Sequence, residues 1–188
     1  MLDPKDHLAA TLKLTRQTQG LSLDKTAEKT GVSKAMLGQI ERGESSPTVA
    51  TLWKIATGLG ISLSTFIEPV PETETQTIVR TADHIRQHPG EDGLMIAPLF
   101  PFEQAFGFEF LELTFLPGYE RISEAHEPGV MEIVSVITGQ LDILSDGHWH
   151  NLKQGQSIRF AGDRTHGYRN PAKTKAIVHT LIHYPHRS

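Results

Sequence analysis

The chain has 188 residues, of which 38% are hydrophobic and 21% charged, and it contains no cysteine. This length suits one ordinary domain or two small ones, and the composition is that of a globular protein and excludes a disordered or fibrous one. No apolar run reaches membrane-spanning length and the first residues lack the apolar core of a secretory signal, so we expect a cytoplasmic protein without a membrane partner. Any metal must be held by histidines and carboxylates.

The net charge of −4 conceals a difference between the two parts of the chain. Residues 1–68 carry eight basic and seven acidic residues, a net charge of +1, which leaves −5 for the remainder. The negative total therefore does not exclude nucleic-acid binding, because the local placement of cations matters more than their sum.

Residues 3–66 show the pattern of five short helices, each with a polar cap in front and most with a glycine behind. The apolar stripe of Leu52, Ile55, Ala56 and Leu59 has helical spacing and predicts a buried face. The cap candidates are Asp3, Ser22, Ser33, Thr48 and Ser62, and the helix-ending glycines are Gly20, Gly31, Gly43 and Gly60.

A stretch rich in proline, threonine and acid, PVPETETQT, follows Glu68 and predicts a linker. Beyond it come short alternating runs such as FGFEFLELTFLPG and VMEIVSVITG, typical of strands in a sandwich or barrel. Asp146-Gly147 and Lys153-Gln154-Gly155 have the composition of hairpin turns. We therefore predict an α+β chain of two domains: all-α over 1–68, a linker over 69–80, and all-β over 81–188.

The stretch GLSLDKTAEKTGVSKAMLGQIERGESSPTVATLWKIATGLGISLSTFI places small and apolar residues where two helices cross closely. Gly31 makes the turn between them, and Val32, Leu37 and Ile40 anchor the second helix. That helix is expected to expose Lys34, Ala35, Gly38 and Gln39. Residues 5–68 resemble the phage-repressor (XRE-type) class of helix-turn-helix.

This resemblance implies that the helix over Ser33–Arg42 enters the major groove of an operator DNA. Thr15 and Thr26 occupy positions where the class usually carries core leucines. If these threonines are buried, their hydroxyls need hydrogen-bond partners, and one possibility is that they bond each other. The alternative to DNA binding is a structural bundle whose charges are solvated. The expected base-edge residues are Ser33, Lys34 and Gln39, and the residues expected to fix phosphates or helix packing are Arg16, Ser22 and Arg42.

Two further stretches, PGYERISEAHEPGVMEIVSVITGQLDI and GQSIRFAGDRTHGYRN, resemble the two motifs of the cupin family, a jelly-roll barrel. The family's pattern implies a divalent metal held by histidines and a glutamate, here His126, Glu132 and His166. Glu124 stands where a further histidine belongs and is a possible ligand. Gly118 and Gly139 also fit the first motif, and Gly155, Gly162 and Asn170 fit the second.

On regular strands Glu124, His126 and Glu132 share parity and point into one cavity. Imidazole with carboxylate suits zinc, iron, manganese or nickel. The alternative is that His126 and His166 only hydrogen-bond a polar ligand or fill the barrel interior. We expect His148 and His150 to lie on a hairpin strand with alternating exposure. His179 and His183 are expected to face the cavity or, more simply, to be core histidines, and His186 is expected to lie in a frayed tail. The residues expected to line an effector pocket are Tyr119, Arg121, Glu124, Met131, Phe160 and Tyr168.

Together the two resemblances imply a non-enzymatic transcription regulator, a homodimer whose barrel binds a small polar effector such as an amino acid or related metabolite. One alternative is a non-haem iron oxidase that uses His126, Glu132 and His166. Another is a cupin that serves only to pair two chains.

Overall fold

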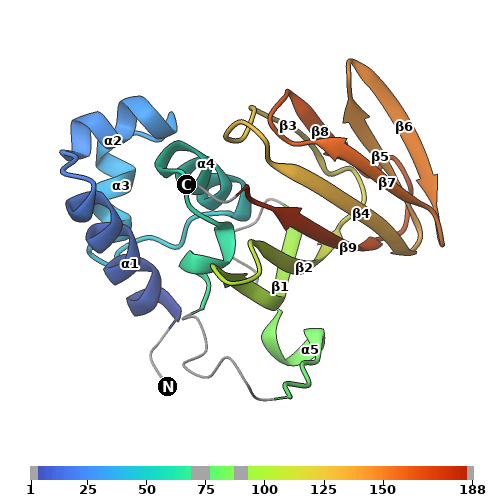
Figure 1. Cartoon of the computed structure of the whole chain (residues 1–188), viewed down its shortest axis with the longest axis horizontal. Coiled ribbons are helices and arrows are strands. Elements are labelled where there is room, and N and C mark those ends of the chain that lie inside the picture. The colour runs from blue at the N-terminus through green and yellow to red at the C-terminus, as the bar shows by residue number, and fades with distance from the viewer. Residues whose placement is uncertain (1–3, 69–76, 87–92, 186–188) are drawn as a thin grey trace. The chain divides into compact units, whose positions relative to one another are not determined.

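The computed structural model describes residues 4–68, 77–86 and 93–185. The chain divides into two compact units, Met1–Ile78 and Val79–Ser188. The first is helical and the second is built mainly of strands (Figure 1), so the predicted two-domain α+β fold is confirmed. Most of the linker expected over 69–80 lies outside the described residues, and its boundaries stay predictions.

Unit 1 consists of short helices whose starts are set by hydroxyl caps. The side chains of Ser22, Ser33 and Thr48 each accept a backbone N–H from the first turn of the helix that follows. Ser62 makes no such bond, and the helix it precedes is a short 3-10 helix, whereas Asp3 lies outside the described residues. The elements are α1 (Pro4–Thr18), α2 (Leu23–Thr30), α3 (Lys34–Glu41), α4 (Val49–Leu59) and η1 (Leu63–Phe66).

The predicted stripe on α4 forms part of the core of unit 1, since all four of its residues are buried. Helix α4 also packs closely on α2 at Gly58, where an added Cβ would lie 2.6 Å from the carbonyl oxygen of Lys29. Thr26 is fully buried, and its hydroxyl donates to the carbonyl of Ser22 within its own helix. Thr15 is only half-buried, and the Thr26 hydroxyl bonds Ser22, so the possibility that the two threonines satisfy each other does not hold.

Unit 2 contains two antiparallel sheets with the orders β1-β2-β9-β4-β7 and β3-β8-β5-β6 (Figure 1). Residues of the two sheets meet in the interior, where the ring of Phe115 stacks on that of Tyr168 at 5.6 Å. The strands are β1 (Leu94–Glu103), β2 (Phe108–Phe115), β3 (Glu120–Ser123), β4 (Met131–Thr138), β5 (Gln140–Ser145), β6 (His148–Lys153), β7 (Ser157–Ala161), β8 (His166–Arg169) and β9 (Ala176–His183).

The predicted turns of unit 2 have different outcomes. Asp146 and Gly147 have φ of 49° and 78° and join the paired strands β5 and β6, as expected. The turn at residues 153–155 is not a hairpin, because β6 pairs in one sheet and β7 in the other, so the chain turns a corner there. A short helix, α5 (Ala82–Ile85), was not anticipated.

Candidate functional site

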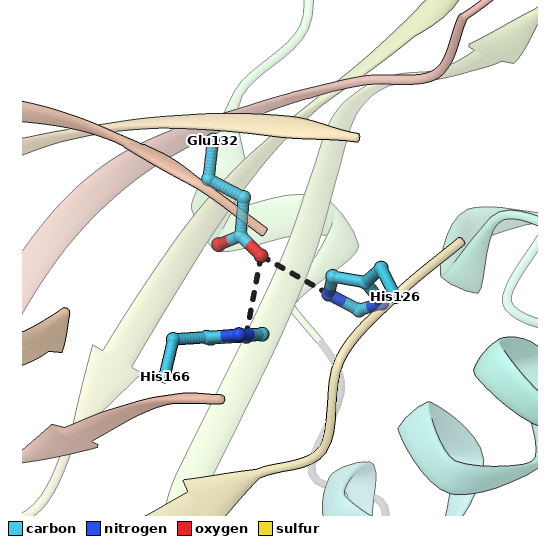
Figure 2. A group of neighbouring side chains, drawn as sticks. All are labelled: His126, Glu132 and His166. Carbon is cyan, nitrogen blue, oxygen red and sulfur yellow. Dashed lines mark hydrogen bonds and ion pairs between the residues drawn. The ribbon is translucent and has the colours of Figure 1, made fainter. Parts of the chain in front are cut away.

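Glu132 is fully buried in the interior of unit 2. It is on β4, where Glu132, Val134 and Val136 are buried and the residues between them are half-buried or exposed, so its carboxylate points inward. Its Oε1 atom lies 3.0 Å from Nε2 of His126 and 3.3 Å from Nε2 of His166 (Figure 2). The three residues predicted from the cupin motifs are thus brought together.

Each histidine is held by backbone contacts. Nδ1 of His166 lies 2.8 Å from the carbonyl oxygen of Arg164, which assigns the proton to Nδ1 and leaves the Nε2 lone pair directed at Glu132. His126 lies between β3 and β4, and its N–H donates to the carbonyl of Gly162. Gly162 in turn donates to Val130, so the two segments carrying His126 and His166 are tied together.

Gly162 has a second role that motif matching did not reveal. An added Cβ at this position would lie 3.1 Å from both Glu132 Oε1 and His126 Cδ2. Those distances are shorter than ordinary van der Waals contact, so a side chain here would press on the ligand group. By contrast, the motif residue Asn170 is architectural, because its buried amide bonds the backbone of Phe115, Ala172 and Thr174.

The electrostatics of the site centre on the pair of Glu132 and Tyr168. Burial of the Tyr168 phenol, followed by the negative charge of Glu132 and the hydrogen bond that its hydroxyl donates to Glu132, holds its pKa well above the usual range. Burial opposes ionisation of Glu132, but the hydrogen bond with His126, the electrostatic effects of His166 and His126 and the Tyr168 hydroxyl together lower its pKa below the ordinary value. The site therefore combines a carboxylate with a neutral phenol.

The donor set fits a divalent metal. Two ligands bound about 2.1 Å from one ion at bond angles of 90–109° lie about 3.0–3.4 Å apart, which matches both carboxylate–imidazole distances. The Nε2 atom of His166 is buried and has no hydrogen-bond partner. An orphaned buried nitrogen of this kind costs about 1–3 kcal/mol, a cost that coordination removes. Two imidazoles and one carboxylate suit the predicted metals.

Four of the residues expected to line an effector pocket face this interior. Tyr119, Phe160 and Tyr168 are buried, and Arg121 lies directly opposite Tyr168 across β3 and β8. Two do not: Met131 precedes Glu132 on β4 and points to the other face, and Glu124 is exposed and lies beyond the end of β3. The strand-parity argument that placed Glu124 in the cavity is therefore wrong.

Four further histidines of the described strands lie away from the group. His179 and His183 are on the outward face of β9, since Val178, Thr180 and Ile182 are its buried residues, so neither predicted location, cavity or core, holds for them. His148 and His150 are exposed on β6, as the hairpin strand predicts. His186 lies outside the described residues.

The second candidate surface is the helix-turn-helix of α2 and α3. Gly31 has φ of 66° and ends α2, and Ser33 caps α3 by accepting the N–H of Met36 at 3.2 Å. Lys34 and Gln39 are exposed on α3, with the ammonium of Lys34 held 2.9 Å from Asp24. Gly38 is buried instead of exposed.

The residues expected at phosphates or in helix packing divide between those two roles. The guanidinium of Arg16 donates to both carboxylate oxygens of Glu41 at 2.6 and 2.9 Å, with exposed fractions of 15% and 9%, which is a packing role between α1 and α3. Ser22 caps α2, and Arg42 pairs with Glu44 on the exposed surface. Sequence reasoning missed Met36, whose side chain is 39% exposed on α3.

Comparison with known proteins gives consistent matches to both units. A helix-turn-helix family model matches residues 12–66, and a cupin domain model matches residues 111–182. The HTH-type transcriptional regulator SutR of Escherichia coli (strain K12) is 49% identical over 178 residues, which cover 95% of each chain. The HTH-type transcriptional regulator PuuR of the same organism is 30% identical and covers 82% of this chain and 83% of its own.

A solved structure agrees with these relatives. The crystal structure of an HTH_3 family transcriptional regulator from Vibrio cholerae has a TM-score of 0.80 and 43% identity, covering 97% of both chains. Among the described helices, none is both long and apolar enough to cross a membrane.

The two family models, the relatives and the solved structure agree with one another. They show that the chain belongs to the family of XRE-type helix-turn-helix transcriptional regulators that carry a cupin domain.

Proposed function

We propose that this regulator binds an operator through α3 and senses a small polar effector at a divalent metal held by His126, Glu132 and His166. The observation that carries the sensing role is the buried group of two imidazoles and one carboxylate, with the orphaned Nε2 of His166 among its donors. When bound, the metal supplies a Lewis acid that attracts oxygen or nitrogen donors of the effector.

The chain's own residues give this site its selectivity. Arg121, opposite Tyr168, offers a guanidinium suited to a carboxylate group of the effector. The phenol of Tyr168 is neutral because its pKa is raised by burial and by Glu132, and it donates its one O–H to Glu132, so its oxygen is left to accept a hydrogen bond from an effector N–H or O–H. Tyr119 and Phe160 supply apolar walls. This chemistry favours amino acids and related small carboxylates.

Regulation requires two copies and a difference in affinity. One helix-turn-helix reads one half-site, so a homodimer reads a two-fold symmetric operator. The effector changes operator binding only if it binds the DNA-competent and incompetent states unequally.

A two-step experiment tests sensing. Metal-loaded protein is screened by thermal shift against amino acids, amines and small carboxylic acids, and each ligand that raises Tm is added to the protein on DNA enriched from a random library. We expect a change in operator Kd of about 5- to 150-fold, the usual range of allosteric coupling. His166→Ala should abolish the response, and His150→Ala, on the exposed β6, should retain it. If every bound ligand leaves the operator Kd unchanged, the cupin serves only to pair chains.

A second candidate function, an iron-dependent oxidase, is favoured by the same ligand set, since two histidines and one carboxylate form the facial triad of non-haem iron enzymes. It predicts substrate-dependent oxygen consumption after addition of Fe²⁺, abolished by His166→Ala. It also predicts that the random library yields no enriched DNA sequence.

A further inference from the structure

We infer that Met36 reads the C5-methyl group of a thymine in each operator half-site. This inference rests on the proposed placement of α3 in the major groove. It starts from an exposed apolar side chain on a helix whose other large apolar residues are buried: Met36 is 39% exposed, whereas Leu37 and Ile40 are 0% and 1% exposed. Ala35, beside it, is exposed as well.

The position of Met36 on α3 suits contact with base edges. It is the third residue of the helix, and its N–H donates to the capping hydroxyl of Ser33, which fixes the first turn. The first turn of a recognition helix is the part that reaches the bases in this motif. Gln39 is three residues further on and lies on the same face of the helix.

The neighbouring cation is held elsewhere in the free protein. The ammonium of Lys34 lies 2.9 Å from the carboxylate of Asp24 on α2. On the exposed side of the first turns of α3, the long side chains without an ion pair are therefore those of Met36 and Gln39. One is apolar and the other is an amide.

The chemistry of Met36 selects one base. A thioether donates no hydrogen bond and accepts only weakly, so it gains most from apolar contact. In the major groove, thymine is the base that presents a methyl group, and the amide of a residue such as Gln39 suits adenine. The flexible methionine side chain adapts to the groove wall. The pair predicts A·T base pairs within the half-site.

The test uses DNA enriched from a random library by the full-length protein. Each thymidine of the enriched half-site is replaced in turn by deoxyuridine, which removes only the C5-methyl group, and Kd is measured for the wild type, Met36→Ala and Met36→Leu. We expect one position at which deoxyuridine weakens wild-type binding about fourfold, the effect of about 0.8 kcal/mol for one buried methyl-sized group. Met36→Ala should be insensitive to that replacement, and Met36→Leu should remain sensitive.

Leu14→Ala provides the matched control, because Leu14 is 66% exposed on α1 and its truncation should leave the deoxyuridine effect intact. Two results overturn the inference: no thymidine at which deoxyuridine changes wild-type Kd, or equal sensitivity in the wild type and Met36→Ala. Failure of the wild type to enrich any sequence is a separate outcome, which overturns the proposed DNA interface together with this inference.

Discussion

At the scale of single residues, Gly162 is the position where the backbone and the ligand group constrain each other most closely. We predict that Gly162→Ala weakens Zn²⁺ binding about tenfold, as changes behind metal ligands commonly do, because the added methyl group displaces Glu132 or His126. Titration calorimetry measures the affinity. Ser157→Ala, an exposed change on β7, is the control, and equal affinities for the two variants would contradict the role given to Gly162.

Tyr168 gives a prediction about pH. Burial raises the pKa of Glu132, but hydrogen bonds and electrostatic effects around the carboxylate outweigh burial and lower the pKa. The hydrogen bond from the Tyr168 hydroxyl is one of these effects. A lowered carboxyl pKa stabilises the fold above the unfolded value, about 4.3, and this contribution is lost as the pH falls through the folded value. Tyr168→Phe should therefore lower the free energy of unfolding by about 1.5–3 kcal/mol at pH 7 and by less at pH 3.5.

Urea unfolding with a chelator present checks this. A Trp53→Phe background leaves Trp149, on β6, to report on the cupin unit alone. If Tyr168→Phe lowers the free energy of unfolding by the same amount at both pH values, that result would count against the coupling of Tyr168 to the Glu132 carboxylate.

The sequence predicted the assembly of His126, Glu132 and His166 but not all of its surroundings. Parity along a regular strand places Glu132 and Phe160 inward, and the same rule places Met131 outward. The rule failed for Glu124 because β3 ends at Ser123. The end of β3 depends on its pairing with β8, which the residues of β3 alone do not specify. The closeness of Gly162 to the ligands depends on contacts that only the folded barrel contains.

At the scale of elements, the ion pair of Arg16 and Glu41 joins α1 to α3 and orients the candidate recognition helix. We predict that Arg16→Ala lowers the free energy of unfolding of unit 1 by about 2–4 kcal/mol, because it leaves a largely buried carboxylate without its cation. Arg42→Ala should cost far less, since its pair with Glu44 is exposed and screened by solvent. Denaturant unfolding followed by Trp53 in a Trp149→Phe background measures both, and similar costs would contradict the difference in burial between the two ion pairs.

Helix caps and strand alternation made most elements predictable, because these signals are local. The Asp146-Gly147 hairpin follows from two residues that accept positive φ. The corner at residues 153–155 has similar turn chemistry, and whether the next strand pairs with β6 or joins the other sheet is decided by distant partners. Strand β1 contains Pro98 and Pro101, which sequence rules disfavour in a sheet, and it lies at an edge where prolines are tolerated.

At the scale of the whole molecule, the proposed homodimer fixes the form of the operator. Two recognition helices related by a two-fold axis require half-sites about 10.5 base pairs apart, or a multiple of that. Inserting about 5 base pairs between the half-sites moves one to the opposite face of the duplex and should lower affinity sharply. Binding assays on the enriched DNA and its insertion variant test this, and unchanged affinity would contradict paired reading.

Native mass spectrometry of the full chain after incubation with Zn²⁺ measures the proposed metal and the proposed dimer in one spectrum. We expect a dimer that carries one ion per barrel and a metal-free dimer for His166→Ala. A wild-type protein that stays free of metal at saturating Zn²⁺, Fe²⁺, Mn²⁺ and Ni²⁺, or a His166→Ala variant that keeps its metal, would contradict sensing through a metal at this site.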